Sequence, residues 1–486
     1  MSDYKFMLES HLTAEQSRAL AVVQRHAADG GLSLFLSGGA MRDMLGGFPI
    51  RDLDFTLEGN AVKFARAIDK AKDAKIVSED DSRKTVELLF ASGVTASIGM
   101  SRVEKFGKPG APPKVTPASI HEDLRGRDFT INSIALSLNK ASHGLLLDPT
   151  NGQADLERRE LRAVSNYTLY DDPGRILRMF RLKARMNLAI HERTLSQYAN
   201  VREAELEARI PTDVLKRELE QIGTEVNCGE VMETLEKEGL LRLFSPALTG
   251  AKLNVAGFSK LQRARQTVPS GMGFRADYYR LFLFFLLEKL SPKDKASLVK
   301  NCHLSKADLN AAAKLAVTAK KFEKTLKAPK LKRPSLVYST LSEGVGEEIL
   351  FVLARSGERL VLDRVKNYFQ KYLPMAQEVT DVEVIAETGL QPGNPKYAKA
   401  KATFISKRLD ARPKKPSPED EAPPVPSAPP ILSRVGRPSG PFTRPAVPRP
   451  PAPAGVAPAR PSPVSPARPT PTASSPTRAM AGKSAP

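Results

Sequence analysis

The spacing of hydrophobic and polar residues divides the chain into stretches of different character. Apolar residues recur at helical spacing over residues 4–29, and the Asp-Gly-Gly sequence at 29–31 ends that pattern. Helical or loop segments then separate short runs typical of β-strands, at 34–37, 52–56, 85–90, 94–100 and 145–147. From about residue 155 the β-type runs vanish, and amphipathic helices follow one another, as at 211–222 and 275–290. This order predicts an α+β protein, with a small mixed sheet first and helices after it.

The composition changes near Ala411. The remaining residues hold about 23 of the 39 prolines and almost no large apolar side chains. Such a segment cannot bury enough surface to offset its chain entropy, so we predict a disordered, polyproline-like tail over 412–486. A spacer is the preferred role for this tail; a proline-motif ligand, a tether and a nonspecific RNA anchor are alternatives.

The charge and the cysteine content narrow the class of protein. A formal net charge of +20 favours a nucleic-acid partner over a merely solvated surface or an anionic membrane. The only cysteines, Cys228 and Cys302, cannot build a disulfide framework or a cysteine-based zinc site. The amino terminus lacks a secretion-signal pattern, and the longest apolar run, 281–287, is too short to cross a bilayer. We therefore expect a soluble cytoplasmic protein that does not bind membranes.

The stretch LSGGAMRD indicates a phosphate-binding turn. A short strand leads into Gly38 and Gly39, and a short helix follows with Arg42 in its first turn. Glycines let backbone N–H groups turn toward a ligand, the helix amino terminus adds positive potential, and an arginine suits a phosphate oxygen. Taken alone, a Gly-Gly turn is more often a tight bend.

The stretch RDLDFT places two carboxylates close to that turn. Asp52 and Asp54 alternate with Leu53 and Phe55, so on a strand the two aspartates project from one face. Mg²⁺ suits two neighbouring carboxylates because it prefers oxygen ligands and completes its shell with substrate phosphates. The alternative is a charged edge strand in which Arg51 balances Asp52. The preceding strand, Gly-Gly turn and helix favour the metal site.

Five segments in a fixed order carry a family resemblance. They are GG-x-x-RD (38–43), D-x-D (52–54), HEDLRGRDFTINSIALSL (121–138), LLLDPTNGQADLERRELRAV (145–164) and LYDDPGRILRMFRLKARMNL (169–188). The chain thereby resembles the class II nucleotidyltransferases, which comprise the tRNA CCA-adding enzymes and the bacterial poly(A) polymerases, over about residues 10–225. Residues 387–410 are similar to the carboxy-terminal part of CCA-adding enzymes.

This resemblance implies a fold and a division into domains. It implies a polymerase-beta-like nucleotidyltransferase head with a small mixed sheet, then an all-helical RNA-binding region. We expect a catalytic head, a helical neck that recognises the nucleotide, a helical RNA-binding body, a carboxy-terminal helical domain and the disordered tail, at 1–150, 151–225, 226–375, 376–411 and 412–486.

The resemblance also implies roles for individual residues. Asp52 and Asp54 would be catalytic and hold the metal ions. The nucleotide would be bound by Gly38, Gly39 and Arg42 at the triphosphate, by Arg127 and Asp128 at the ribose with Asn132 nearby, and by Asp172, Arg175 and Arg178. Arg127 and Asp128 have an alternative interpretation as a surface ion pair, and Asn132 as a hydrogen bond at a helix start.

The sequence DDPGR allows a more specific inference. Asp172 and Arg175 lie three residues apart at a helix start, so both can face one ligand. A carboxylate accepts from an exocyclic amine and a guanidinium donates to ring acceptors, so the pair would admit CTP and ATP and reject UTP and GTP. The resemblance implies the same role. The alternative is that Asp172 caps the helix with Pro173 at its first position; both can hold.

The sequence departs from the family pattern at several positions. Ser97 stands where members often carry an acidic residue, and Glu87 or Glu104 could compensate. Gly126 replaces a common second arginine. Gly174 replaces a leucine and would loosen the first helical turn by up to about 1 kcal/mol.

Two basic clusters are candidate RNA contacts, since phosphates dominate the affinity of proteins for RNA. The first contains Lys320, Lys321, Lys324, Lys327, Lys330, Lys332 and Arg333; the second contains Lys399, Lys401, Lys407 and Arg408. A plain solvated helix face is an equally open interpretation of either cluster. Aromatic residues make up only 6% of the chain and tryptophan is absent, which favours recognition of the shape and backbone of a structured RNA such as a tRNA acceptor end.

These observations predict an enzyme that adds CMP and AMP from CTP and ATP to the 3′ end of tRNA, with Mg²⁺ and release of pyrophosphate. The nearest alternatives are a poly(A) polymerase, which the basic tail favours, and an enzyme restricted to A or to CC addition. The segment GLQPGNPKY (389–397) favours CCA addition. A non-catalytic RNA-binding relative is a further alternative, supported only by Ser97.

Overall fold

The computed structural model describes residues 4–269 and 273–411. The described residues belong to one compact unit, Met1–Pro413. The predicted disordered tail, 412–486, lies outside them. The division of the first 411 residues into four domains stays a prediction.

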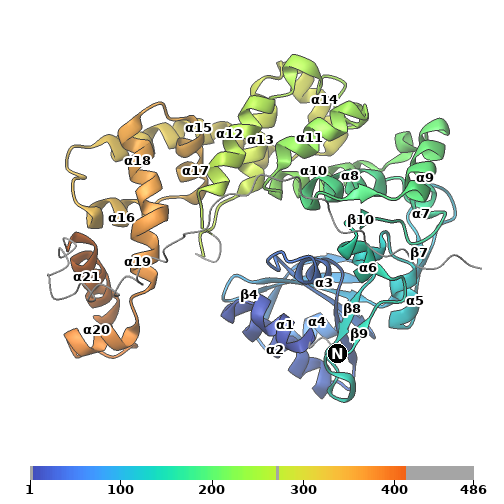
Figure 1. The fold of residues 1–486 in the computed structure, drawn as a ribbon, viewed down its shortest axis with the longest axis horizontal. Helices are drawn as coiled ribbons and strands as arrows, with labels where there is room; N and C mark the ends of the chain where they lie inside the picture. Colours follow the sequence, from blue (N-terminus) through green and yellow to red (C-terminus); the bar gives the residue numbers. More distant parts are fainter. Residues whose placement is uncertain (1–3, 270–272, 412–486) are drawn as a thin grey trace, which may run out of the picture. The chain divides into compact units, whose positions relative to one another are not determined.

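A seven-stranded mixed sheet forms the amino-terminal part, in the order β3-β4-β5-β2-β1-β8-β9 (Figure 1). Its strands are β1 (Ser33–Ser37), β2 (Leu53–Glu58), β3 (Ala74–Asp80), β4 (Thr85–Phe90), β5 (Thr95–Met100), β8 (Ala135–Ser137) and β9 (Leu146–Leu147). Strands β2 and β5 pair in parallel, and the other neighbours pair antiparallel. The predicted α+β class with a mixed sheet is confirmed.

Helices α1 (Tyr4–His11), α2 (Ala14–Asp29), α3 (Gly38–Leu45) and α4 (Ala61–Lys70) accompany this sheet, with α2 and α4 packed against its strands (Figure 1). The single helix expected over 4–29 is two helices. The first ends at His11, and Thr13 caps the second, since its side chain and that of Gln16 form a capping box. Leu36 and Leu53 are fully buried in the core between helices and strands.

Short elements connect the sheet to the helical region. The hairpin β6 (Arg102–Lys105) and β7 (Lys114–Pro117) precedes α5 (Ile120–Arg125), η1 (Thr130–Asn132), η2 (Lys140–Ser142) and α6 (Gly152–Glu157). A two-stranded parallel pair, β10 (Glu160–Leu161) with β11 (Ala189–Ile190), follows. The expectation that no strand occurs after residue 155 is therefore wrong, because two-residue strands leave no pattern in the sequence.

Helices make up the rest of the described chain, in the order α7 (Thr168–Asp171), α8 (Arg175–Met186), α9 (Glu192–Glu203), η3 (Leu206–Arg209), α10 (Thr212–Thr224), α11 (Cys228–Lys237), η4 (Leu240–Leu243), η5 (Gly250–Lys252), α12 (Val255–Gln266), α13 (Tyr278–Glu288), α14 (Pro292–Cys302), α15 (Lys306–Lys327), α16 (Pro334–Ser342), α17 (Gly346–Arg355), α18 (Arg359–Asn367), η6 (Tyr368–Tyr372), α19 (Leu373–Gln377), α20 (Asp381–Thr388) and α21 (Tyr397–Asp410). The helices expected at 211–222 and 275–290 are α10 and α13. Within 4–269 and 273–411, no helix combines the length and apolar character needed to cross a membrane.

Candidate active site

A cavity of about 350 Å³ collects most of the predicted site residues. Its walls come from the β1–α3 turn, β2, β5, β6, the segment 123–132, the start of α8 and helix α10. The predicted residues that line it are Gly38, Gly39, Asp54, Arg127, Asp128, Asn132, Asp172, Arg175 and Arg178. Arg42 and Asp52 are not part of this lining, although Arg42 contacts the lining residue Asn132. No residue of the first basic cluster lines the cavity.

The Gly-Gly turn approaches Asp54 so closely that only glycine fits. A Cβ atom on Gly39 would lie 2.6 Å from Asp54 Oδ2. Gly38 has a φ of +60°, a conformation that strains other residues. Helix α3 begins at Gly38, so its amino-terminal turn faces the carboxylate of β2. The two glycines thus bring a helix start and an acidic side chain into one space.

Asp52 and Asp54 lie on the opposite side of the chain from two core residues. Leu53 and Phe55 are 0% and 2% exposed, whereas both aspartates escape the core. Asp52 Oδ1 accepts a hydrogen bond of 2.9 Å from the Thr95 hydroxyl. Burial, with the charge of Asp52 second, raises the pKa of Asp54 to about 6. A half-buried carboxylate beside a second carboxylate favours a cation between them.

The donor set fits Mg²⁺ only as an incomplete ligand shell. In the described part of the chain no group of three or more Asp, Glu, His or Cys side chains could hold a metal ion. Two carboxylates suit Mg²⁺, which keeps several waters and takes phosphate oxygens from a substrate. Asp52 and Asp54 are therefore the residues that would hold it.

The residues considered as replacements for an acid at Ser97 lie in different surroundings. Ser97 is the direct partner of Asp54 on β5, and Glu87 on β4 is the next partner in that row. Glu87 is exposed and does not line the cavity, whereas Glu104 does. Glu104 pairs with Arg102 at 2.8 Å and lies 3.8 Å from Arg175, so the positive charges near the cavity already engage it.

Arg42 is buried, and each of its three guanidinium nitrogens donates one hydrogen bond, which uses three of its five N–H groups. It lies in the last turn of α3, not the first as expected, because the helix already starts at Gly38. Its Nε and Nη2 donate to Asp43 Oδ1 at 3.0 and 2.8 Å, and its Nη1 donates to Asn132 Oδ1 at 2.8 Å. Burial lowers the pKa of Arg42 to about 10, although Asp43 opposes the shift. A nearby anion would stabilise this desolvated cation.

Arg127 and Asp128 do not pair with each other, which excludes the surface ion pair considered for them. Arg127 pairs with Asp123 at 2.8 Å. It also donates to the hydroxyls of Ser37 and Thr56 at 3.1 and 2.8 Å.

Asp128 connects this part of the cavity to α8. It accepts from Asn132 Nδ2 at 2.9 Å and pairs with Arg178 at 2.8 Å. Burial opposes its ionisation, yet Arg178 and other partners hold the pKa of Asp128 below its usual value. The buried Asn132 therefore bridges Arg42 and Asp128 in the η1 turn, and it is not a helix-start hydrogen bond.

Asp172 and Arg175 face each other at the amino-terminal end of α8. Asp172 Oδ2 lies 3.8 Å from Arg175 Nε, and Asp172 Oδ1 accepts the N–H of Gly174 at 3.0 Å. The carboxylate thus organises the turn before α8. The capping interpretation is wrong in detail, because α8 begins at Arg175 with Gly174 at its N-cap position and no side-chain cap, so Pro173 is not the first helical residue. The Arg175 guanidinium lies 5.6 Å from the ring centre of Phe106. Both side chains keep free hydrogen-bonding capacity toward the cavity.

The basic clusters differ in how far their charges are paired. Lys320, Lys321 and Lys324 are exposed on α15, and Lys327 pairs with Glu358 at 3.0 Å. In the second cluster the pairs are Lys401 with Asp381, Lys407 with Glu387 and Arg408 with Glu383, at 2.7, 2.9 and 3.0 Å. This pairing with α20 favours a structural role for most of the second cluster.

Several charged residues around the site were not singled out from the sequence. Arg83 lies 3.9 Å from Asp172, and Asp43, Glu218 and Glu225 hold arginines of α3 and α8. The only available signal was Asp43, which closes the GG-x-x-RD motif. Glu218 and Glu225 lie about 180 residues further along the chain, and no local pattern connects them to the site.

Residues 34–162 match the family model described as the Poly A polymerase head domain. This match confirms the resemblance that the motifs carry in this part of the chain.

Curated relatives carry several names. The A-adding tRNA nucleotidyltransferase of Halalkalibacterium halodurans is 36% identical over 194 residues, which cover 40% of this chain and 45% of the relative. The CC-adding tRNA nucleotidyltransferase of Deinococcus radiodurans is 37% identical over 155 residues, 32% of this chain and 41% of the relative. The chain thus spans less than half the length of either relative. A solved structure of a CCA-adding enzyme in apo form II is 23% identical, with a TM-score of 0.49, covering 85% of this chain and 96% of that one.

Proposed function

We propose that this protein is a template-independent nucleotidyltransferase that adds CMP and AMP from CTP and ATP to the 3′ end of tRNA. The observation that carries the proposal is the single cavity in which the Gly38–Gly39 turn, Asp54 and the pair of Asp172 and Arg175 face one another. A phosphate-binding turn, a metal-binding carboxylate and a base-reading pair are the parts that such a reaction needs. The matched head domain and the names of the curated relatives support the same class of reaction.

In this proposal each part of the cavity has one task. The α3 amino terminus and Arg42 hold the triphosphate, while Arg127 and Asp128 orient the ribose. Asp172 accepts from the exocyclic amine of cytosine or adenine, and Arg175 donates to the neighbouring ring acceptor. Positioning of this kind supplies most of the catalysis in phosphoryl and nucleotidyl transfer.

The reaction joins the terminal ribose hydroxyl of the RNA to the α-phosphate and releases pyrophosphate. Mg²⁺ held by Asp52 and Asp54 would supply Lewis-acid stabilisation of the phosphate oxygens. The exposed lysines of α15, Lys320, Lys321 and Lys324, are the proposed RNA contacts. No base pairing to a template is needed, because the protein side chains read the nucleotide.

A second candidate function is partial addition. The relatives named as A-adding and CC-adding enzymes are each more than a third identical to this chain over the matched segments. The proposed site residues of this chain would serve A addition, CC addition and CCA addition equally well. The cavity alone therefore does not distinguish partial addition from CCA addition. The GLQPGNPKY segment favours the full reaction.

One assay tests these alternatives. The full chain is incubated with Mg²⁺ and with tRNAs lacking CCA, CA or only A, and each labelled nucleotide is supplied separately. Ordered addition of C, C and A that then stops supports the proposal. Addition of A only to the tRNA that lacks A, or of CC only, supports partial addition. Unlimited addition of A to any RNA indicates a poly(A) polymerase, and no incorporation contradicts all three.

A further inference from the structure

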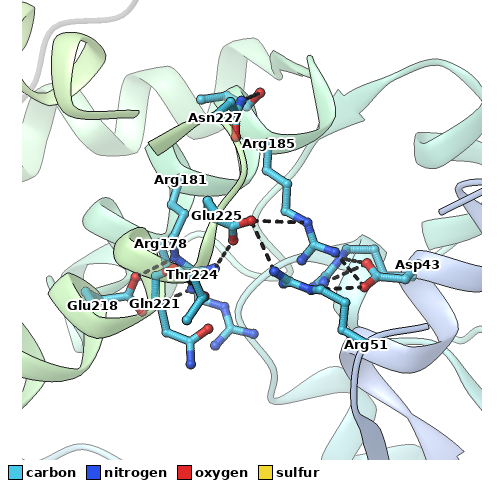
Figure 2. Close-up of polar contacts among 12 residues, drawn as sticks. Asp43, Arg51, Arg178, Arg181, Arg185, Glu218, Gln221, Thr224, Glu225 and Asn227 are labelled. Carbon is cyan, nitrogen blue, oxygen red and sulfur yellow. Dashed lines mark hydrogen bonds and ion pairs between the residues drawn. The ribbon is translucent and has the colours of Figure 1, made fainter. Parts of the chain in front are cut away.

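Helix α8 carries four arginines along one face. Arg178, Arg181 and Arg185 follow Arg175 at intervals of three, three and four residues, so the four side chains form one stripe. Arg175 faces the cavity. The other three arginines form ion pairs with carboxylates from three other segments. Figure 2 shows the contacts of Arg181 and Arg185.

Two buried carboxylates, Asp43 and Glu225, pair with the last two arginines of this stripe. Arg185 Nη2 lies 2.6 Å from Asp43 Oδ2, and Arg185 Nε lies 3.6 Å from Glu225 Oε2. Arg181 Nη1 lies 3.1 Å from Glu225 Oε1 (Figure 2). Arg51 completes the group, with Nη1 3.2 Å from Glu225 Oε2 and Nε 3.9 Å from Asp43 Oδ2.

The arrangement is buried on every side except at Arg51. The side chains of Asp43 and Glu225 are 3% and 2% exposed, and that of Arg185 is 8% exposed. Buried ion pairs of this kind add little net stability, since desolvation offsets their attraction. Several directional contacts made at once restrict how the helices can shift or rotate against one another.

Asp43 joins this group to the triphosphate end of the cavity. Its Oδ1 accepts both Nε and Nη2 of Arg42, while its Oδ2 accepts Arg185. A second connection runs from Arg42 through Asn132 and Asp128 to Arg178. Helix α8 is therefore tied to α3 at two points, seven residues apart, and both points lie on the stripe that ends at Arg175.

We propose that Asp43 and Glu225 are positioning residues that fix the rotation of α8 against α3, so that Arg42 and the base-reading pair act on one nucleotide together. Neither carboxylate touches the nucleotide in this scheme. Asp43 links α3, the phosphate-binding helix, to Arg185 of α8. Glu225, at the end of α10, holds Arg181 and Arg185 of α8. The inference rests on the proposed function, because it concerns how that site selects its nucleotide.

The competing interpretation is that the group serves only to hold the fold together. A purely structural role predicts that substitutions lower stability and reduce the use of all nucleotides alike. A positioning role predicts that the preference for CTP and ATP over UTP and GTP declines, since a rotated α8 no longer presents Asp172 and Arg175 correctly.

The test compares Asp43→Asn and Glu225→Gln with a matched control. Glu207→Gln also removes a carboxylate that is 2% exposed and has two arginine partners, Arg202 and Arg242 at 3.4 and 2.9 Å, but neither of these partners belongs to α3 or α8. Two readouts are taken on the full chain: equilibrium binding of each of the four nucleotides, and kcat/KM for single incorporation on tRNA lacking CCA.

We expect both test variants to lose about tenfold in the ratio of correct to incorrect nucleotide, a loss within the range that a small displacement of reacting groups produces. The control retains the wild-type ratio at a comparable Tm. If a single variant fails to fold, the double variant Arg185→Gln/Glu225→Gln removes one charge of each sign and gives the same readout. Arg185→Lys, which keeps the charge and loses the forked geometry, should show an intermediate ratio.

The results distinguish the positioning role from the proposed function. Selective wild-type protein together with equally selective test variants overturns the positioning role and leaves the proposed function intact. Wild-type protein that binds no nucleotide overturns both.

Discussion

Two groups of carboxylates lie close together in this protein and have opposite surroundings. Asp54 lines a cavity beside the exposed Asp52, and burial raises the pKa of Asp54 to about 6. Asp43 and Glu225 are more deeply buried, and each contacts two or more arginines. The difference teaches that neighbouring acids serve two purposes here. Within the part of the chain that the structure describes, Asp52 and Asp54 form no arginine pairs of this kind and can bind a cation, whereas Asp43 and Glu225 are already paired with arginines and can hold helices in place.

The largest effect should come from Asp54→Asn. We expect nucleotide incorporation to fall by about a thousandfold or more, as for the loss of a central electrostatic group in an active site. Single-turnover incorporation measures this loss. A control is Asp171→Asn. Asp171 precedes Asp172 in the chain but does not line the cavity, so this variant should keep a rate close to wild type. An active Asp54→Asn variant would contradict the assignment.

The base-reading pair should give the next largest effect. The double variant Asp172→Asn/Arg175→Gln replaces an acceptor and a donor by amides that can pair in either sense. We expect the preference for CTP over UTP to fall by about a hundredfold, because a matched polar site rejects a mismatched base strongly. Competition between labelled CTP and UTP measures the ratio. If nucleotide choice is unchanged, this pair does not read the base.

Stability should respond to the two carboxylate groups with opposite signs. Asp43→Asn leaves Arg185 and Arg42 short of a partner and should lower the free energy of unfolding by about 3–5 kcal/mol. Asp54→Asn removes a destabilising charge and should raise it in metal-free protein by on the order of 1–3 kcal/mol. Urea unfolding in EDTA tests both; two losses of similar size would erase the contrast.

The same contrast has a pH dependence. Because burial raises the folded-state pKa of Asp54 to about 6, the folded protein holds this proton more tightly than the unfolded chain. The metal-free wild type should therefore lose stability relative to Asp54→Asn as the pH rises through about 4 to 6. Thermal unfolding at several pH values measures the difference, and a gap that stays constant across this range would contradict it.

The smallest effect concerns the exposed lysines. Replacing Lys320, Lys321 and Lys324 by glutamine should weaken tRNA binding and reduce the slope of its salt dependence by about one for each RNA phosphate that a lysine neutralises in the wild type. The matched control is Lys401→Gln with Lys407→Gln, since those lysines already pair with α20. Unchanged salt dependence in the triple variant would identify the α15 face as merely solvated.

The sequence pattern predicted strands β1, β2, β4, β5 and β9 of the seven-stranded sheet and missed β3 and β8. Strand β3 is mostly exposed and contains four polar residues among seven, and β8 has only three residues, so neither carries a period-two pattern. The division between α1 and α2 was legible in Thr13 and Gln16, which form a capping box. The motifs correctly identified eight nucleotide-site residues and Asp54 as members of one cavity.

The buried arginine group could not be predicted in the same way. Its members come from positions 43, 51, 181–185 and 218–225, and only the folded chain brings these segments together. Arginines on α8 read as an ordinary charged helix face, because no local signal shows that Arg181 and Arg185 point inward. Long-range ion pairs leave no periodic trace in a single sequence.

Gly174 is the one departure from the family pattern whose reason is visible. A Cβ atom at this position would lie 2.6 Å from Val214 Cγ1 on α10 and 3.0 Å from Asp172 Oδ1. The missing side chain therefore gives α10 room to pack against the turn that carries Asp172, the proposed base-reading carboxylate. A leucine transplanted here from a relative would need a smaller partner at 214, so these two positions should be exchanged only as a pair.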